Sequence, residues 1–219
     1  MSKRPRNRSR GAEPIDEVTP EHAWVGPLAR VLATAPGRPD DSPGHALPRA
    51  AVALLLRAAP AGTELLLIRR AERVDDPWSG HVALPGGREQ PEDPGPAGTA
   101  ARETREEVGI DPEGGGLLVG PLQPVWPRSE RAPRILVRPY VFAVGAGAEP
   151  TPNHEVDAAF WLPVRELREP GAVTEHLLEL EGIGPLRFPA FGWRGHVVWG
   201  LTHRILSDFL ERADEAGLR

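Results

Sequence analysis

The sequence predicts an α+β fold in which a mixed β-sheet packs between helices. Short apolar runs typical of strands occur along most of the chain, and helical patterns stand between them. The two kinds of segment do not follow the regular alternation of βαβ units, which favours a mixed sheet over a parallel one. With 219 residues, 40% of them hydrophobic and 26% charged, the chain has the composition of an ordinary globular protein and can form a substantial core.

The N-terminal region differs in composition from the rest of the chain. Its first ten residues, MSKRPRNRSR, contain five basic residues and no acidic residue, and we expect a disordered basic tail over 1–20. Residues 21–48 follow as a short helix at 21–35 and a linker rich in proline and glycine. The folded domain is therefore expected at 49–214.

Within this domain, the first expected elements are a β-hairpin, a short strand and a helix. Apolar runs at 50–56 and 64–70 flank the turn sequence APAGT, and HVALP at 81–85 is the short strand. The helix covers 94–109, with prolines at its start and Gly109 where a left-handed C-cap belongs. Further along we expect strands at 116–126, 134–144 and 158–163, a short helix at 164–169, a hairpin made of 185–191 and 196–200, and a C-terminal amphipathic helix at 201–216.

Composition excludes several classes of protein. The chain has no cysteine, which rules out disulfides, cysteine-ligated zinc and thiol catalysis. No apolar stretch is long enough to cross a membrane, and the basic tip lacks the apolar region of a signal peptide, so we expect a cytoplasmic protein without a membrane partner. The net charge of −5 does not favour nucleic acid as a partner. If the basic tip did bind nucleic acid, its removal would abolish that salt-dependent binding.

Three glutamates are crowded into the segment RETREEVGI at 102–110. In a helix, Glu103, Glu106 and Glu107 lie three and four residues apart and project from one side, where like charges oppose one another. Carboxylate oxygens suit hard divalent cations, and magnesium is held by a few carboxylates together with waters and substrate phosphates. The segment therefore indicates a metal site, with a solvated acidic face paired to nearby arginines as the alternative.

The surrounding stretch, GGREQPEDPGPAGTAARETREEVGI at 86–110, resembles the Nudix box. The positions that match its fixed pattern are Arg102, Glu103, Glu106, Glu107, Gly109 and Ile110. Thr104 stands at a position that is usually apolar, and one extra residue separates Gly87 from Arg102. The first acid of the pattern would fall at Pro94, so Glu92 or Asp93 must serve in its place.

This resemblance implies a Nudix fold, a mixed sheet between helices with the box as a loop–helix–loop. It implies an enzyme that hydrolyses diphosphates linked to another moiety, with Mg²⁺ or Mn²⁺ as cofactor. Glu103, Glu106 and Glu107 would hold the metal, Arg102 would orient the glutamates, and Glu103 is also a candidate for the general base. The catalytic candidates are accordingly Glu103, Arg102 and Glu106. Gly86 and Gly87 would allow the close backbone approach that substrate binding needs, although alone they could be an ordinary turn.

The approach to the box, LLLIRRAERVDDPWSGHVALPGG at 65–87, is similar to that of the coenzyme A diphosphatase branch. The implied substrate is coenzyme A or an acyl-coenzyme A, hydrolysed to 3′,5′-ADP and 4′-phosphopantetheine. Trp78 stands where that branch usually has histidine, and His81 where it has glutamine or glutamate. ADP-ribose, a dinucleotide or a nucleoside triphosphate thus stay open as substrates. A non-catalytic nucleotide-sensing module is the alternative of another class, and the intact set of box glutamates argues against it.

Five further residues are candidates for the site, each with a structural alternative. Arg69 and Arg70 end a predicted strand and could bind phosphate, or form a surface pair. His81 could contact phosphate or a metal-bound water, or be a half-buried strand residue. Trp78 could stack on a base or cover the sheet, and Glu155 is a candidate for an additional metal ligand. The expected partner is a small-molecule diphosphate, and a homodimer stays open.

Overall fold

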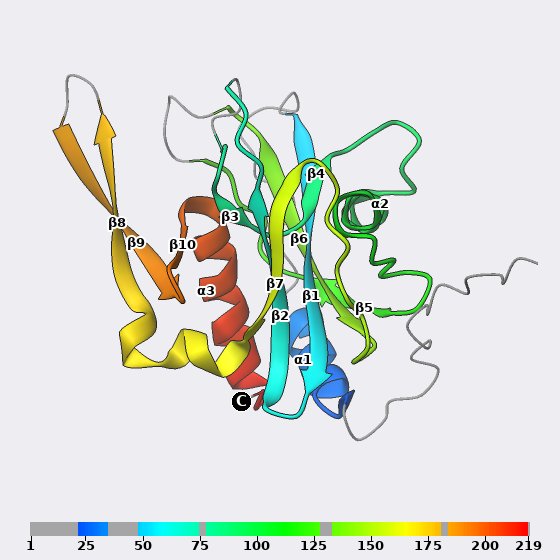
Figure 1. Cartoon of the computed structure of the whole chain (residues 1–219). Helices are drawn as coiled ribbons and strands as arrows, with labels where there is room; N and C mark the ends of the chain where they lie inside the picture. The colour runs from blue at the N-terminus through cyan, green and yellow to red at the C-terminus, as the bar shows by residue number, and fades with distance from the viewer. Residues whose placement is uncertain (1–21, 35–47, 75–77, 128–132, 181–183, 219) are drawn as a thin grey trace, which may run out of the picture.

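A computed structural model describes residues 22–34, 48–74, 78–127, 133–180 and 184–218 (Figure 1). The predicted tail at 1–20 and most of the predicted linker lie outside these residues. The helices are α1 (Val25–Thr34), α2 (Pro96–Val108) and α3 (Gly200–Glu215), with short 3₁₀ helices at Val164–Arg168 and Pro170–Ala172. The strands are β1 (Arg49–Ala59), β2 (Gly62–Arg70), β3 (Val82–Ala83), β4 (Gly86–Arg88), β5 (Leu117–Pro121), β6 (Leu136–Val144), β7 (Val156–Pro163), β8 (Val173–Leu180), β9 (Gly184–Trp193) and β10 (His196–Trp199).

The centre of the molecule is a seven-stranded mixed sheet. Its main path runs β3-β2-β1-β6-β5, with β4 paired to β1 and β7 paired to β2. Strands β1 and β6 are parallel, whereas the other pairs of this sheet are antiparallel. Helix α2 lies on one side of the sheet, and α1, α3 and the smaller sheet β10-β9-β8 lie on the other (Figure 1). The predicted α+β fold, a mixed sheet between helices, is confirmed.

Strand β1 is buried on both faces because it lies between the two halves of the core. Ala51, Ala53 and Leu55 face α2, where they pack with Ala100 and Ala101 of the helix. The small alanine side chains on both elements allow α2 to approach the sheet closely. This close packing fixes the position of the helix that carries the box glutamates.

The opposite face of β1 belongs to the larger part of the core. Leu54 and Leu56 pack there together with Leu206 and Phe209 of α3. Leu28 of α1 is fully buried in the same cluster. A helix that the sequence places before the domain therefore contributes to the domain's core. No helix among the described residues is long and apolar enough to span a membrane.

Two local predictions need correction. HVALP was expected as one strand, but the structure has β3 at Val82–Ala83 and a separate strand β4 that includes both box glycines. Strand β8, VTEHLLEL, was not predicted at all. Val173 and Leu177 of β8 are 71% and 56% exposed, so this strand lacks the single buried face whose alternation would have revealed it.

Candidate active site

Glycine and proline residues set the ends of the box helix α2. Gly95 precedes the helix with φ of 130°, and Pro96 occupies the first position, where its missing N–H costs nothing. Gly109 ends the helix in the left-handed conformation at φ of 69°, and its N–H donates to the Arg105 carbonyl at 3.0 Å. The predicted C-cap is confirmed, and the helix begins two residues later than predicted.

Thr104 departs from the apolar residue that the box pattern has at this position, yet it is fully buried. Its hydroxyl donates to the carbonyl of Ala100, one turn earlier, at 2.7 Å. Because this hydrogen bond satisfies the hydroxyl within the helix, threonine can take the place of an apolar residue without leaving a buried polar group unpaired. The departure is compatible with an intact box.

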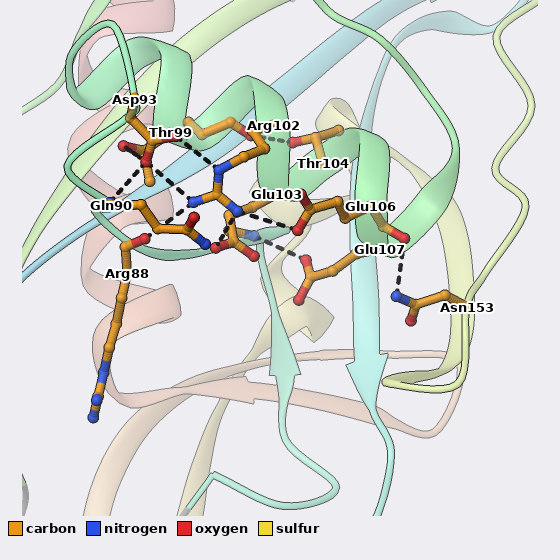
Figure 2. A network of polar contacts seen from close by, with 12 residues as sticks. Arg88, Gln90, Asp93, Thr99, Arg102, Glu103, Thr104, Glu106, Glu107 and Asn153 are labelled. Carbon is orange, nitrogen blue, oxygen red and sulfur yellow. Dashed lines mark hydrogen bonds and ion pairs between the residues drawn. The ribbon is translucent and has the colours of Figure 1, made fainter.

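Arg102 makes polar contacts with three acidic residues of the box (Figure 2). Its Nε and Nη2 donate to the two carboxylate oxygens of Asp93 at 2.7 and 3.1 Å. Its Nη1 lies 2.9 Å from Oε1 of Glu103 and 3.1 Å from Oε2 of Glu106. One guanidinium therefore orients two of the three box glutamates, and Asp93, not Glu92, supplies the upstream acid.

The pair of Asp93 and Arg102 is shielded from solvent, with side chains 5% and 16% exposed. The hydrogen bond from Arg102 holds the pKa of Asp93 well below its usual range, and hydrogen bonds from Gln90 and Thr99 act in the same direction. The pKa of Arg102 is raised, chiefly by its hydrogen bond with Asp93. Asp93 therefore anchors Arg102 and the loop, and this carboxylate is committed to that structural task.

Glu107 is the most buried of the box glutamates, with only 3% of its surface exposed. Its Oε2 accepts a hydrogen bond from the backbone N–H of Gly86 at 2.9 Å. Burial raises the pKa of Glu107 to about 7, and the Glu103 and Glu155 charges add to the rise, against the Gly86 hydrogen bond and the Arg70 charge. Burial likewise raises the pKa of Glu103. Both carboxylates thus lie where a nearby cation would be strongly favourable.

The two box glycines are required by close contacts on opposite sides of β4. A β-carbon on Gly87 would lie 2.4 to 2.6 Å from the carboxylate atoms of Glu103. Gly86 has φ of 151°, and a β-carbon there would lie 2.3 Å from the carbonyl oxygen of Ala51 on β1. Gly87 therefore leaves space for a site carboxylate, whereas Gly86 allows β4 to pair with β1.

A loop that comes much later in the chain contacts the end of α2, next to the box glutamates. Asn153 donates through Nδ2 to the Glu106 carbonyl at 2.9 Å, and its backbone N–H donates to the Glu107 carbonyl at 2.9 Å (Figure 2). Its Oδ1 accepts the backbone N–H of Glu155 at 2.7 Å. Asn153 thereby ties the end of α2 to Glu155, a role that the sequence analysis missed because nothing local marks it.

Arg69 and Arg70 end β2 as predicted, but their charges act on different sides of the sheet. The charge of Arg70 acts on Glu107 of the box, whereas that of Arg69 acts on His196 of β10 and its side chain pairs with Asp157. Both residues line a cleft of about 450 Å³. The other residues that line it are Ala71, Glu72, Gly80 and Asp157. The cleft is of a size that suits a small-molecule ligand.

His81 contacts the second sheet, whereas Trp78 packs against the larger part of the core. The ring of His81 is 4.9 Å from that of Trp199, which stacks on His176 at 4.1 Å. Trp78 is partly buried against the larger core cluster. These positions favour a packing role for Trp78. His81 follows the cleft residue Gly80 in the chain, and its ring contacts the cluster of Trp199 and His176.

The donor set of the box fits a divalent cation, by the chemistry of its residues. Among the described residues, no three acidic or imidazole side chains already converge into a metal-binding group. Yet Glu103 and Glu107 are carboxylates with raised pKa values, and the charge of Glu155 acts on both. Oxygen donors that are desolvated and mutually repulsive are the kind that hard cations stabilise.

Comparison with known proteins identifies the family. The model of the NUDIX domain matches residues 47–179. The chain therefore belongs to the Nudix hydrolases. These enzymes hydrolyse diphosphate bonds and generally require divalent metals. The resemblance that the box predicted is confirmed.

Curated relatives match this chain over different lengths. The uncharacterized Nudix hydrolase NudL of Photorhabdus laumondii is 32% identical over 183 residues, which cover 83% of this chain and 91% of the relative. The human mitochondrial coenzyme A diphosphatase NUDT8 is 33% identical over 169 residues, which cover 70% of this chain and 63% of the human protein. A shorter match, 57% identical over 47 residues, covers 22% of this chain and 14% of the uncharacterized protein C14C4.10c of Schizosaccharomyces pombe.

A solved structure supports the fold. The crystal structure of a MutT/nudix family protein from Enterococcus faecalis superposes with a TM-score of 0.50 at 17% sequence identity. The superposition covers 85% of this chain and 70% of that protein. At this identity the likeness concerns the fold alone.

Proposed function

We propose that this protein hydrolyses the diphosphate bond of coenzyme A or of an acyl-coenzyme A, with Mg²⁺ or Mn²⁺ as cofactor. The observation that carries the proposal is the arrangement around Arg102, which holds Glu103 and Glu106 beside the buried Glu107. The choice of substrate is supported by the approach to the box and by the 33% identity with a coenzyme A diphosphatase. The products would be 3′,5′-ADP and 4′-phosphopantetheine.

In this reaction the side chains have separate tasks. Glu103, Glu106 and Glu107 would hold the cation, with Glu155 as a further ligand. A bound divalent cation would neutralise charge on the diphosphate and activate a water. Glu103 is the candidate to accept the proton of the attacking water, since its raised pKa brings it nearer to the range of a general base. Arg102 would keep Glu103 and Glu106 oriented throughout.

The substrate would lie along the cleft at the end of β2. Arg70 is the better candidate for a phosphate contact, because its charge already acts on the box side of the sheet. Water attacks one phosphorus, the bond from that phosphorus to the bridging oxygen breaks, and the bridging oxygen leaves with the other product. The phosphates carry the negative charge on both sides of the broken bond, so cations along the cleft stabilise the transition state.

A panel of diphosphates tests this proposal. Coenzyme A, acyl-coenzyme A, ADP-ribose, NADH, diadenosine polyphosphates and nucleoside triphosphates would each be incubated with Mg²⁺, with Mn²⁺ and with chelator. Glu107→Gln serves as the inactive variant, and Glu211→Gln, which changes an exposed residue of α3, serves as its matched control. We expect metal-dependent release of 3′,5′-ADP from coenzyme A that is lost only in Glu107→Gln.

The other outcomes have distinct meanings. Faster turnover of ADP-ribose, a dinucleotide or a triphosphate would support diphosphate hydrolysis but would reject coenzyme A as the substrate. Trp78 and His81 would then be the residues to substitute. Absence of turnover on every compound, with metal and nucleotide still bound, would favour the non-catalytic sensing module.

A further inference from the structure

One residue near the site was not among the predicted candidates. Arg73 follows the end of β2, and its Nη2 lies 3.0 Å from Oε1 of Glu155. The backbone N–H of Arg73 donates to Ser79 Oγ at 2.8 Å, so the main chain at this position is tied down. The side chains of Arg73 and Glu155 are 45% and 42% exposed, which leaves both of them room to change partner.

Glu155 in turn is held close to the box by its backbone. Its N–H donates to Asn153 Oδ1 at 2.7 Å, and its carbonyl accepts the N–H of Ala71 at 2.9 Å. These bonds leave its carboxylate as the part that can move. Because Asn153 also donates to the carbonyls of Glu106 and Glu107, at 2.9 Å each, it holds Glu155 beside the end of α2.

As a ligand of the divalent cation, Glu155 would offer the metal the same carboxylate oxygen that Arg73 contacts at 3.0 Å, whereas His154 Nε2 lies farther from it, at 3.9 Å. A carboxylate that serves a divalent cation as ligand gives up much of its interaction with a guanidinium, since the cation draws its charge and fixes its orientation. A guanidinium released in this way is a strong donor to phosphate, with a planar fork that matches two phosphate oxygens. Arg73 directly follows Ala71 and Glu72 in the chain, and these two residues line the cleft.

We propose that Arg73 and the divalent cation compete for the Glu155 carboxylate, so that metal binding frees the Arg73 guanidinium to bind a phosphate of the substrate. Arg73 thereby links the two binding events: it opposes the metal in the absence of substrate and supports the substrate once the metal is bound. This inference rests on the proposed function, because it takes Glu155 as a ligand of the metal. It adds a phosphate-binding residue and a reason for metal to bind before substrate.

The competition predicts opposite effects of one substitution. In Arg73→Gln, Mn²⁺ should bind the substrate-free protein about two- to fivefold more tightly, the range expected for loss of an exposed ion pair that the metal otherwise has to break. The same variant should have a raised KM for coenzyme A, because a phosphate contact is lost. A residue with a merely structural role would not strengthen one ligand while weakening the other.

A double-mutant cycle separates this competition from simple removal of a positive charge. Mn²⁺ affinity would be measured by calorimetry on the full chain for wild type, Arg73→Gln, Glu155→Gln and the double variant, with circular dichroism to verify folding. If Arg73 acts through Glu155, Arg73→Gln has no effect on Mn²⁺ affinity in the Glu155→Gln background. Arg69→Gln is the matched control, since Arg69 is 46% exposed and pairs with Asp157 instead.

The inference is overturned if Arg73→Gln leaves Mn²⁺ affinity unchanged or weakens it, or if its effect persists in the Glu155→Gln background. It is also overturned if Arg69→Gln strengthens Mn²⁺ binding as much as Arg73→Gln does. These results would leave the proposed function standing. A wild-type protein that neither binds Mn²⁺ nor hydrolyses any diphosphate of the panel would instead overturn the proposed function, and the competition with it.

Discussion

The carboxylate of Glu103 occupies the space where the side chain of any other residue at position 87 would begin. A β-carbon on Gly87 would lie 2.4 Å from the carboxyl carbon of Glu103, far inside van der Waals contact. Glu103 is at the same time fixed by Arg102, at 2.9 Å. The glycine and the arginine together define where this carboxylate can lie, and two substitutions at neighbouring glycines separate site geometry from stability.

Gly87→Ala should inactivate the enzyme without unfolding it. The added methyl group displaces the end of a flexible side chain, which costs little stability, but a misplacement of about 1 Å at a reacting group can lower kcat roughly 100-fold. The measurement is kcat with saturating Mg²⁺, alongside the midpoint of urea unfolding. Gly147→Ala is the control, because Gly147 has no atom within 4 Å of the added carbon. Unchanged activity in Gly87→Ala would show that Glu103 does not need its present position.

Gly86→Ala should instead destabilise the fold. The new β-carbon meets backbone atoms of β1, 2.3 Å from the Ala51 carbonyl oxygen, and φ of 151° is a region that residues with a side chain rarely adopt. We expect the free energy of unfolding to fall by at least about 2 kcal/mol, measured by urea denaturation. If Gly86→Ala were as stable as wild type, the pairing of β4 with β1 would not need this backbone geometry.

Asp93→Asn should lower stability at neutral pH, because it leaves the shielded charge of Arg102 without its main partner. The expected loss is about 2 to 3 kcal/mol, and kcat should fall as well since Arg102 orients two glutamates. Because the pKa of Asp93 is lower in the folded than in the unfolded state, its stabilisation is complete above the ordinary value of 3.8 and is lost as the pH falls below it. The difference between wild type and variant should therefore shrink in acid.

Urea unfolding at several pH values measures this effect, and Glu92→Gln is the control. Glu92 is the neighbouring acid on the same loop, and it is exposed. If Glu92→Gln cost as much stability as Asp93→Asn, the upstream acid of the box would not be Asp93 alone.

The contrast between Glu92 and Asp93 also shows which parts of the site could be predicted from the sequence. The spacing of Glu103, Glu106 and Glu107 is local, so a helix alone puts them on one side, and this cluster of carboxylates could be predicted. The pattern required an acid upstream but could not choose between two neighbours. That choice depends on the fold of the loop, in which Gln90 and Thr99 also reach Asp93.

The contacts that Asn153 and Arg73 make from distant loops could not be predicted. Asn153 reaches the end of α2 across 47 positions, and Arg73 reaches Glu155 across 82. Neither lies in a periodic segment, and an asparagine or arginine in a loop is ordinary. Such contacts are set by the chain path between elements, whereas sequence patterns report only on contacts within one element.

Glu107→Gln should stabilise the chelator-treated protein at high pH while abolishing activity. The pKa of Glu107 is raised to about 7 in the folded state, above its ordinary 4.5, so between these values the folded state keeps a proton that the unfolded state releases. The free energy of unfolding of the wild type therefore falls as pH rises from 4.5 to about 7. Above about pH 7 this loss of stability stays at its full size, because Glu107 is ionised in both states. Glutamine keeps an oxygen for the Gly86 N–H and carries no charge to desolvate.

At about pH 8 we expect the variant to be more stable than wild type by on the order of 3 kcal/mol, and at about pH 4 to be equal to it. Thermal unfolding in the presence of chelator measures this difference. Addition of Mg²⁺ should reverse the order at high pH, because the cation stabilises only a protein that can offer the Glu107 carboxylate. A variant that is less stable than wild type at about pH 8 in chelator would contradict the assignment. The Glu107 carboxylate would then not be a desolvated group that lacks sufficient positive charge nearby.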